Sequence, residues 1–319
     1  MSLDALGWNE RLQQEFLEHA QGGLMPGRVI GEHRTHFDVA VEGGELTAEI
    51  PGRLRNAAKI RSDLPGVGDY VALTPSDGDG PAIIEAVLPR TSAIIRQAAG
   101  ERRPQLVAAN VDIVFVVTAL DGDFSLERIM RYLTVIDEGG ATPVIVINKS
   151  DIGSGLEEAL AELRAAAPDV KIDVVCAHNA ADVARLEAYF EGGRTIALLG
   201  SSGVGKSTLT NQLLGREAQV TQTVREHDNR GRHTTTHRQL FVREGGGSIM
   251  DTPGMRGLEM WEAEPMTADD NEFETIEALA LECKFRNCGH TSEPSCAVRA
   301  AVKSGEIAAD VLERYLAED

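Results

Sequence analysis

Hydrophobic and polar positions follow two different patterns along this chain of 319 residues. From about Gly27 to Gln97, short runs alternate between apolar and polar positions and are broken by turn residues, including the glycine pair at 43–44 and the segment PSDGDG at 75–80. Short strands at this spacing predict a small barrel of about five strands. Residues 1–24 come before it and are typical of a short, mostly polar helical segment.

After Arg103 the pattern changes to strands that alternate with helices. The continuous apolar run at 111–120 predicts a strand buried on both faces. Residues 125–140 have hydrophobic side chains at helical spacing, with Gly139 as a cap. Further elements are predicted in the order strand, helix, strand, helix, strand, at 143–147, 156–167, 172–176, 183–190 and 195–199. This alternation predicts a mostly parallel sheet that binds ligands at the carboxyl ends of its strands.

The segment GSSGVGKS at 200–207 follows one of these strands and matches the phosphate-binding loop pattern in full. Its glycines let backbone N–H groups face phosphate oxygens, and the dipole of the next helix favours an anion there. We expect Lys206 to reach the β- and γ-phosphates and the Ser207 hydroxyl to ligate Mg²⁺. The expected nucleotide-binding residues of this loop are Gly200, Ser201, Ser202, Gly203, Val204, Gly205, Lys206, Ser207 and Thr208.

A second motif, NKSD, follows the strand at 143–147 and consists of Asn148, Lys149, Ser150 and Asp151. The Asp151 carboxylate can accept hydrogen bonds from N1–H and the exocyclic amine of guanine, and adenine lacks both donors. A buried site of this kind can reject the wrong base by roughly 10⁴-fold. We expect Asn148 on the N7 side of the base and the Lys149 stem over its ring. Alone, the motif also suits a turn that caps the next helix; with a phosphate loop it indicates guanine and disfavours an ATPase.

A third motif, DTPG, runs from Asp251 to Gly254. An aspartate at a strand end can hold Mg²⁺ through water, and the Gly254 N–H can bond the γ-phosphate. The segment GRHTTTHR at 231–238 lies between the phosphate loop and DTPG. A threonine there can ligate Mg²⁺ only while the γ-phosphate is present, as in the switch of a GTPase. Thr234 and Thr235 are both candidates.

The C-terminal region contains three of the four cysteines, within residues 283–296. Cys283, Cys288, His290 and Cys296 make a Cys₃His set, which is a normal closed tetrahedral zinc site. The alternative is a group of buried thiols beside a surface histidine. Such a zinc ion would stabilise the fold rather than catalyse a reaction. A helix predicted over 300–318 would pack against it.

The motifs occur in a permuted order: NKSD, Cys176-Ala177, phosphate loop, threonine loop and DTPG. This is a Ras-like set cut and rejoined at another loop, which a parallel sheet tolerates. With the segment AANVDIVFVV at 108–117, the order resembles the circularly permuted ribosome small-subunit-dependent GTPase family of the RsgA/YjeQ type, from about Gly27 to the C-terminus. The resemblance implies a multidomain α/β protein with an N-terminal OB-fold β-barrel, a circularly permuted Ras-like P-loop GTPase domain and a small zinc-binding helical domain.

On this basis we divide the chain into a helical extension at 1–24, the barrel at 25–97, the GTPase domain at 98–262 and the zinc-binding domain at 263–319. The resemblance implies an enzyme that binds the small ribosomal subunit and its rRNA, and that hydrolyses GTP to GDP and phosphate late in small-subunit assembly. It also places the Ala177 N–H toward guanine O6, with Cys176 where serine is usual.

Two features favour an alternative, in which the chain is a nucleotide-gated RNA- or protein-binding module and hydrolysis is incidental. Met255 follows DTPG, where a Ras-like enzyme has a nearby glutamine that orients water. The family resemblance offers His233 as a substitute, and the alternative is that His233 only lies near the phosphates and has no catalytic part. The net charge is −19, and residues 1–97 contain 9 Lys/Arg against 14 Asp/Glu. RNA contacts would then depend on basic stretches such as 52–61 and 225–238.

Composition adds only broad limits, because 42% hydrophobic and 25% charged residues are ordinary for a globular protein. No apolar run approaches the ~20 residues that span a membrane. The N-terminus has no basic segment followed by an apolar one, as a secretory signal would have. We therefore expect a cytoplasmic protein without membrane contact. Separately, we expect a monomer.

Overall fold

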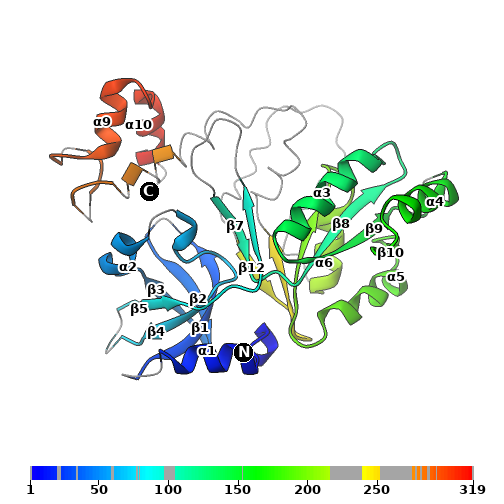
Figure 1. Ribbon diagram of the computed structural model, residues 1–319, viewed down its shortest axis with the longest axis horizontal. Coiled ribbons are helices and arrows are strands. Elements are labelled where there is room, and N and C mark those ends of the chain that lie inside the picture. The colour runs from blue at the N-terminus through cyan, green and yellow to red at the C-terminus, as the bar shows by residue number, and fades with distance from the viewer. Residues whose placement is uncertain are drawn as a thin grey trace.

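The structure is a computed structural model of the chain. It describes residues 2–19, 23–33, 35–58, 61–76, 78, 80–96, 105–152, 154–215, 239–251 and 275–317, without 277–278, 281, 286–287 and 292. Figure 1 shows a β-barrel beside a larger α/β region, with the C-terminal helices at the end of the barrel opposite to α1.

The N-terminal third forms a closed five-stranded barrel. A 3₁₀ turn, η1 (Asp4–Leu6), and helix α1 (Glu10–Leu17) come first, and the Asn9 side chain caps α1 by accepting the Leu12 N–H. The barrel strands are β1 (Met25–Glu32), β2 (Phe37–Val41), β3 (Gly44–Glu49), β4 (Tyr70–Thr74) and β5 (Ala82–Val87). Their order is β1-β2-β3-β5-β4, and β4 pairs with β1 to close the barrel.

Only one strand pair in the barrel is parallel, β3 with β5, among the described residues. Helix α2 (Gly52–Ala57) and the turn η2 (Arg61–Asp63) connect β3 to β4. Val39, Val71, Leu73 and Ile84 are fully buried, as the period-two pattern of the sequence requires. The predicted five-stranded, OB-like barrel is confirmed.

A separate two-stranded sheet follows the barrel, made of β6 (Ala93–Arg96) and β7 (Gln105–Ala109). β6 lies within the predicted barrel segment 25–97, but it pairs with β7 rather than with a barrel strand. The barrel strands themselves end at Val87. The four domain limits stay predictions.

The central region is a mostly parallel sheet with helices on both faces. Its strands have the order β10-β9-β8-β11-β13-β12, and β12 alone runs antiparallel among them. The elements are β8 (Ile113–Ala119), α3 (Leu126–Glu138), β9 (Thr142–Asn148), α4 (Leu156–Ala166), β10 (Lys171–Val174), α5 (Ala180–Ala184), η3 (Arg185–Phe190), β11 (Thr195–Leu199), α6 (Lys206–Leu214), β12 (Gln239–Val242) and β13 (Ser248–Asp251). Every strand and helix predicted between 111 and 199 has its counterpart here.

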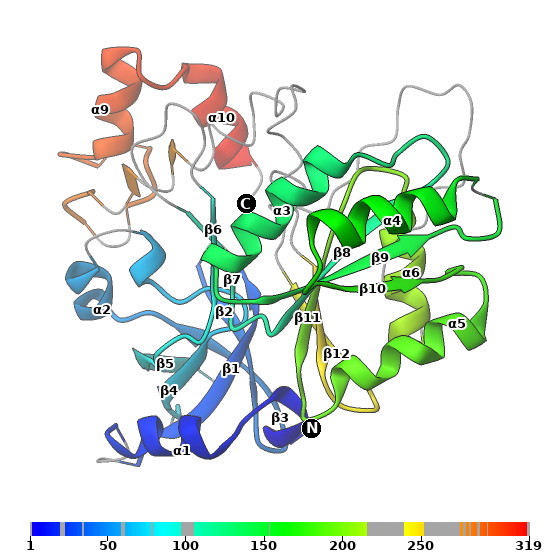
Figure 2. The same ribbon diagram turned by 45° about the vertical axis from the view of Figure 1, so that its right-hand side comes forward.

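Two layers of helices cover the sheet, as Figure 2 shows. β8 illustrates how the sequence produces them, since all seven of its residues are buried. Val114 and Val116 belong to the hydrophobic core that includes residues of α3 and α4. Phe115 and Val117 belong to the core of α6 and η3 on the other face. A strand buried on both faces therefore appears in the sequence as a continuous apolar run.

Glycines end α3 in a way that the sequence predicts to within one residue. Gly139 is the C-cap, as expected, but it keeps a right-handed φ of −76°. The left-handed turn falls on Gly140, whose φ is 76°. A glycine at that position avoids the steric cost that other residues meet there.

The barrel and the central sheet form one continuous eleven-stranded sheet, because β1 pairs with β12. The pairing joins Gly31 to Gln239. Buried Arg28 strengthens the same junction: its guanidinium donates to the carbonyl oxygens of Leu6 at 2.6 Å, Asn110 at 3.1 Å and Gly68 at 3.2 Å. One side chain thus connects the N-terminal segment, the barrel and the entry to β8.

The C-terminal module has its own small core, made of Ile276, Val298, Ala301, Ile307, Val311 and Tyr315 with Cys296. The single helix predicted over 300–318 is wrong. The structure has two helices, α9 (Ala297–Ser304) and α10 (Ala309–Ala317), because Gly305 caps α9 with a left-handed φ of 80°. No helix within the described part of the chain is long and apolar enough to cross a membrane.

Candidate nucleotide-binding and metal sites

The phosphate loop connects the buried strand β11 to α6, and two of its glycines are required by close contacts. Gly200 has a φ of 149°, and a side chain there would overlap the Val117 carbonyl group. Gly205 has a φ of 99°, and a side chain there would overlap the Asn148 amide nitrogen. The loop therefore lies directly against the ends of β8 and β9.

Lys206 begins α6 and folds back over the loop. Its Nζ donates to the carbonyl oxygens of Gly200 and of Ser201, the latter at 2.7 Å. No side chain caps the N-terminus of α6, because the cap residue is Gly205. Backbone N–H groups at a helix N-terminus together with a lysine ammonium group attract phosphate.

Asn148 connects the phosphate loop to the loop that contains Cys176 and Ala177. The residue is 1% exposed. Its Nδ2 donates to the Val204 carbonyl oxygen at 2.8 Å, and its Oδ1 accepts the Ala177 N–H at 2.9 Å. Three segments that are far apart in sequence, 148–151, 176–177 and 200–208, therefore meet at one point.

The same contact bears on the expected bond from Ala177 to guanine O6. In this structure the single Ala177 N–H is donated to Asn148. Contact with O6 would therefore require that this hydrogen be shared or released. The neighbouring Cys176 is a half-buried free thiol, and its N–H is donated to Asp182 Oδ2 at 2.9 Å.

Lys149 and Asp151 lie in the turn that follows β9. Lys149 has a positive φ of 57°, and its Nζ is 2.6 Å from Asp121 Oδ2. Asp151 is exposed. Ser150 donates its N–H to the Val175 carbonyl oxygen at 3.2 Å, which fixes the turn against β10. The carboxylate that would recognise the base is thus accessible from solvent.

Asp121 is a candidate site residue that the sequence reasoning missed. It lies in the loop between β8 and α3, and its carboxylate holds the Lys149 ammonium group in an ion pair. The available signal was its position after a buried strand, because ligand-binding residues gather at the carboxyl ends of parallel strands.

The residues expected around the γ-phosphate are only partly described. Asp251 ends β13, which pairs in parallel with β11 through Ala197 and Met250. Its main chain therefore lies at the same edge of the sheet as the phosphate loop. His233, Thr234, Thr235 and Gly254 lie outside the described residues, so their roles stay predictions.

Cys283, Cys288, His290 and Cys296 form a compact group whose ligand atoms all lie within 4.8 Å of one another. Cys283 Sγ is 3.7 Å from Cys296 Sγ, and His290 Nδ1 is 3.6 Å and 3.4 Å from these two sulfurs. A tetrahedral zinc site separates two sulfurs by about 3.8 Å and a sulfur from a nitrogen by about 3.5 Å. The spacing fits zinc.

The surroundings of the group also suit a metal. Desolvation and the adjacent Cys296 and Cys283 thiols raise the pKa of Cys288 to about 12. Such thiols ionise only when a cation compensates the charge, and binding then releases protons. Cys296 Sγ accepts the Arg299 N–H at 3.4 Å, so one sulfur also caps α9. A bound ion would therefore connect the cysteine loop directly to the small helical core.

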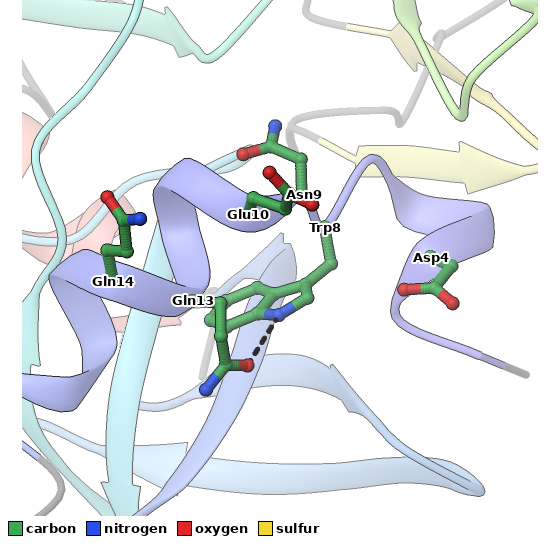
Figure 3. A pocket seen from close by; sticks show the side chains of 6 residues that line it. All are labelled: Asp4, Trp8, Asn9, Glu10, Gln13 and Gln14. Atoms are coloured by element: carbon green, nitrogen blue, oxygen red, sulfur yellow. Dashed lines mark hydrogen bonds between the residues drawn. The ribbon is translucent and has the colours of Figure 1, made fainter.

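One further hollow lies beside α1 and is shown in Figure 3. The Trp8 indole N–H donates to Gln13 Oε1 at 3.2 Å across it. Its lining residues are Asp4, Trp8, Asn9, Glu10, Gln13 and Gln14. None of these belongs to the nucleotide or cysteine motifs, so the hollow is separate from both sites.

Comparison with known proteins shows the family. The model of the RsgA GTPase family matches residues 87–261. The small ribosomal subunit biogenesis GTPase RsgA of Opitutus terrae is 42% identical over 316 residues, which cover 96% of this chain and 86% of that protein. The chain belongs to the RsgA GTPase family. RsgA 2 of Lactiplantibacillus plantarum is 41% identical, over 92% of this chain and 82% of that protein.

Two solved structures have the fold of this RsgA-family chain. The crystal structure of YjeQ from Thermotoga maritima has a TM-score of 0.56 and 27% identity, and the match covers 92% of this chain and 97% of that one. YloQ, described as a circularly permuted GTPase, has a TM-score of 0.53 and 23% identity, over 94% and 96% of the two chains.

Proposed function

We propose that this chain is a GTPase that binds the small ribosomal subunit, hydrolyses GTP to GDP and phosphate, and acts late in small-subunit assembly. The observation that carries the proposal is the pair of hydrogen bonds made by Asn148, which joins the guanine motif to the phosphate loop. The names of the curated relatives support the choice of the small ribosomal subunit. They do not favour a binding module in which hydrolysis is incidental.

The base would be selected by Asp151, which accepts hydrogen bonds from the two donors that only guanine presents. Asn148 already gives one Nδ2 hydrogen to Val204, and its second hydrogen is the one proposed for N7. Lys149 would pack its stem over the ring while Asp121 holds its ammonium group. Cys176 and Ala177 would border the O6 side.

The triphosphate would bind to the backbone N–H groups of residues 200–208 and to Lys206. Lys206 would exchange its two loop carbonyl partners for β- and γ-phosphate oxygens, a stronger interaction because both partners are charged. Nucleotide binding would therefore free two loop carbonyl groups as it engages the lysine.

The residues at this edge of the sheet fit Mg²⁺, which prefers oxygen ligands. Ser207, in the first turn of α6, would supply a hydroxyl, and Asp251, which ends the neighbouring strand, would supply a carboxylate that acts through water. Thr234 or Thr235 would complete the set while GTP is bound. When bound, Mg²⁺ neutralises charge on the β- and γ-phosphate oxygens.

His233 would orient the attacking water, because the Met255 side chain can neither donate nor accept a strong hydrogen bond. The Gly254 N–H would hold the γ-phosphate. We expect slow hydrolysis by the free enzyme and faster hydrolysis when the small subunit is bound.

The Cys₃His group would hold one structural Zn²⁺ per chain and stabilise the C-terminal module. Since DTPG directly precedes this module in the permuted chain, changes at the γ-phosphate could reach it through the connecting segment. The protein would act in the cytoplasm as a monomer, without membrane contact, and would bind rRNA through local basic stretches.

Sedimentation with purified small subunits tests this proposal. A non-hydrolysable GTP analogue should promote co-sedimentation, and GDP should weaken it. His233→Ala should retain GTP-dependent docking and lose most of the stimulated hydrolysis, whereas Lys206→Ala should lose nucleotide binding and docking together. Docking that is the same with every nucleotide would instead favour the binding-module alternative. Equal stimulation of the His233→Ala variant would remove this histidine from the mechanism.

A further inference from the structure

The turn between β1 and β2 brings together His33, His36 and Asp38, which belong to neither site above. The His33 N–H donates to the His36 carbonyl oxygen at 2.9 Å and closes the turn. The two imidazole rings stack with centroids 4.4 Å apart and planes inclined by 16°. His33 Nε2 lies 2.7 Å from Asp38 Oδ2.

Strand geometry places the carboxylate on the histidine side. Phe37 is 5% exposed and belongs to the barrel core, so its neighbours His36 and Asp38 are directed to the other face. Asp38 pairs with Gly31 across the strands. A side chain at position 31 would come within 2.9 Å of Asp38 Oδ2. Glycine at 31 therefore leaves the space that the carboxylate occupies.

We propose that His33, His36 and Asp38 form a second metal site, for a divalent ion of the zinc, cobalt and nickel class. Their ligand atoms, one from each residue, all lie within 4.8 Å of one another. Two imidazoles with one carboxylate suit these metals better than Mg²⁺ or Ca²⁺, which prefer oxygen ligands alone. Three protein ligands leave at least one position for water.

The outer contacts of the turn agree with this assignment. Thr35 Oγ1 lies 3.2 Å from His36 Nδ1. A metal-binding histidine usually donates its other ring N–H to an oxygen, and Thr35 Oγ1 is placed to accept that hydrogen from His36 Nδ1, which would leave Nε2 for the metal. The ion would replace the hydrogen between His33 and Asp38. The two ligand atoms, now 2.7 Å apart, would move apart by a further ~0.7 Å to reach tetrahedral spacing. The proton is released to solvent.

The position of the site gives it a structural consequence. Gly31 pairs both with Asp38 and with Gln239, the first residue of β12. β12 begins directly after the threonine loop at 231–238. An ion at the turn would therefore stabilise β1, the barrel strand that pairs with β12 at Gln239, the residue that directly follows 231–238 in the sequence.

Cobalt titration of the full-length, zinc-loaded protein tests the proposal, with visible absorption as the readout. A single equivalent of zinc fills the Cys₃His group beforehand, because three thiolates bind zinc more tightly than the turn does. One equivalent of Co²⁺ should then bind to the turn with d–d bands and without thiolate charge-transfer absorption. His33→Ala and His36→Ala should each weaken Co²⁺ binding by more than about 100-fold, and Thr35→Val by about tenfold. His19→Ala, which alters a histidine at the end of α1, should change nothing.

Three results would overturn the site. One is wild-type protein that binds no Co²⁺ beyond its zinc. Another is Co²⁺ binding that survives unchanged in the double variant His33→Ala/His36→Ala. The third is a thiolate charge-transfer band that accounts for all of the bound Co²⁺, which would show that the metal enters the Cys₃His group and not the turn. Thr35→Val removes only a hydroxyl on an exposed turn residue, so its effect is measurable even if the histidine variants fold poorly.

Discussion

Replacement of Asn148 by alanine tests whether one side chain holds the nucleotide site together. Its amide donates to the Val204 carbonyl oxygen at 2.8 Å and accepts the Ala177 N–H at 2.9 Å. Both backbone partners belong to residues that are at most 4% exposed. The variant Asn148→Ala would leave one buried donor and one buried acceptor without their partner.

The expected cost follows from those two groups. A buried polar group that loses its hydrogen-bond partner costs about 1–3 kcal/mol, so the pair should lower the free energy of unfolding by about 2–6 kcal/mol. Nucleotide affinity should fall as well, because both loops lose their common support and the base would lose the N7 contact proposed for Asn148. A loss of about 2–3 kcal/mol corresponds to roughly 30- to 150-fold weaker binding.

Urea denaturation followed by circular dichroism gives the stability, and a fluorescent GDP analogue gives the affinity. Asn179→Ala is the matched control, because exposed Asn179 also accepts a backbone N–H, from Ala181 at 3.0 Å, as the cap of α5. Loss of such a cap should cost about 1 kcal/mol. If Asn148→Ala is no less stable than Asn179→Ala and binds GDP normally, the bridging role is refuted.

Three further predictions concern the base, the cysteine group and the lysine anchor. Asp151→Asn should shift preference from GTP toward xanthosine triphosphate, and unchanged GTP affinity in competition binding would contradict the placement of the base. Cys288→Ser should abolish zinc binding and unfold the C-terminal module while nucleotide binding remains; metal analysis that finds no zinc in fresh wild-type protein would refute the site. Asp121→Asn should lower the affinity for GDP and GTP alike, since both share the base near Lys149, yet change stability by less than about 1 kcal/mol because the ion pair is partly exposed. If calorimetry gives the variant the same GDP and GTP affinities as the wild type, Asp121 does not position the lysine.

Local patterns were sufficient to predict most elements of the central sheet. The fully buried β8 and the amphipathic α3 each leave a periodic signal, because burial on two faces or on one face selects residues at fixed spacing. The break between α9 and α10 was missed, although Gly305 was visible in the sequence. A glycine is compatible with a helix interior as well as with a C-cap, and only the packing of both helices on one core decides between them.

Contacts between distant segments were not predictable in the same way. Asn148 and Val204 are 56 residues apart, and nothing local to either residue indicates that the amide faces that carbonyl group. The pairing of Gly31 with Gln239 likewise depends on how the barrel meets the sheet. Sequence motifs therefore predicted which residues would carry the chemistry, and the tertiary structure shows which contacts hold the described ones in position.

The central claim is that this chain is a GTPase activated by the small ribosomal subunit, and the rate of phosphate release from GTP with and without purified subunits tests it most directly. The account predicts slow release by the free protein, strong acceleration by the subunit, and none in Lys206→Ala under either condition. ATP should not replace GTP. A rate that the subunit leaves unchanged, or equal turnover of ATP and GTP, would contradict the account.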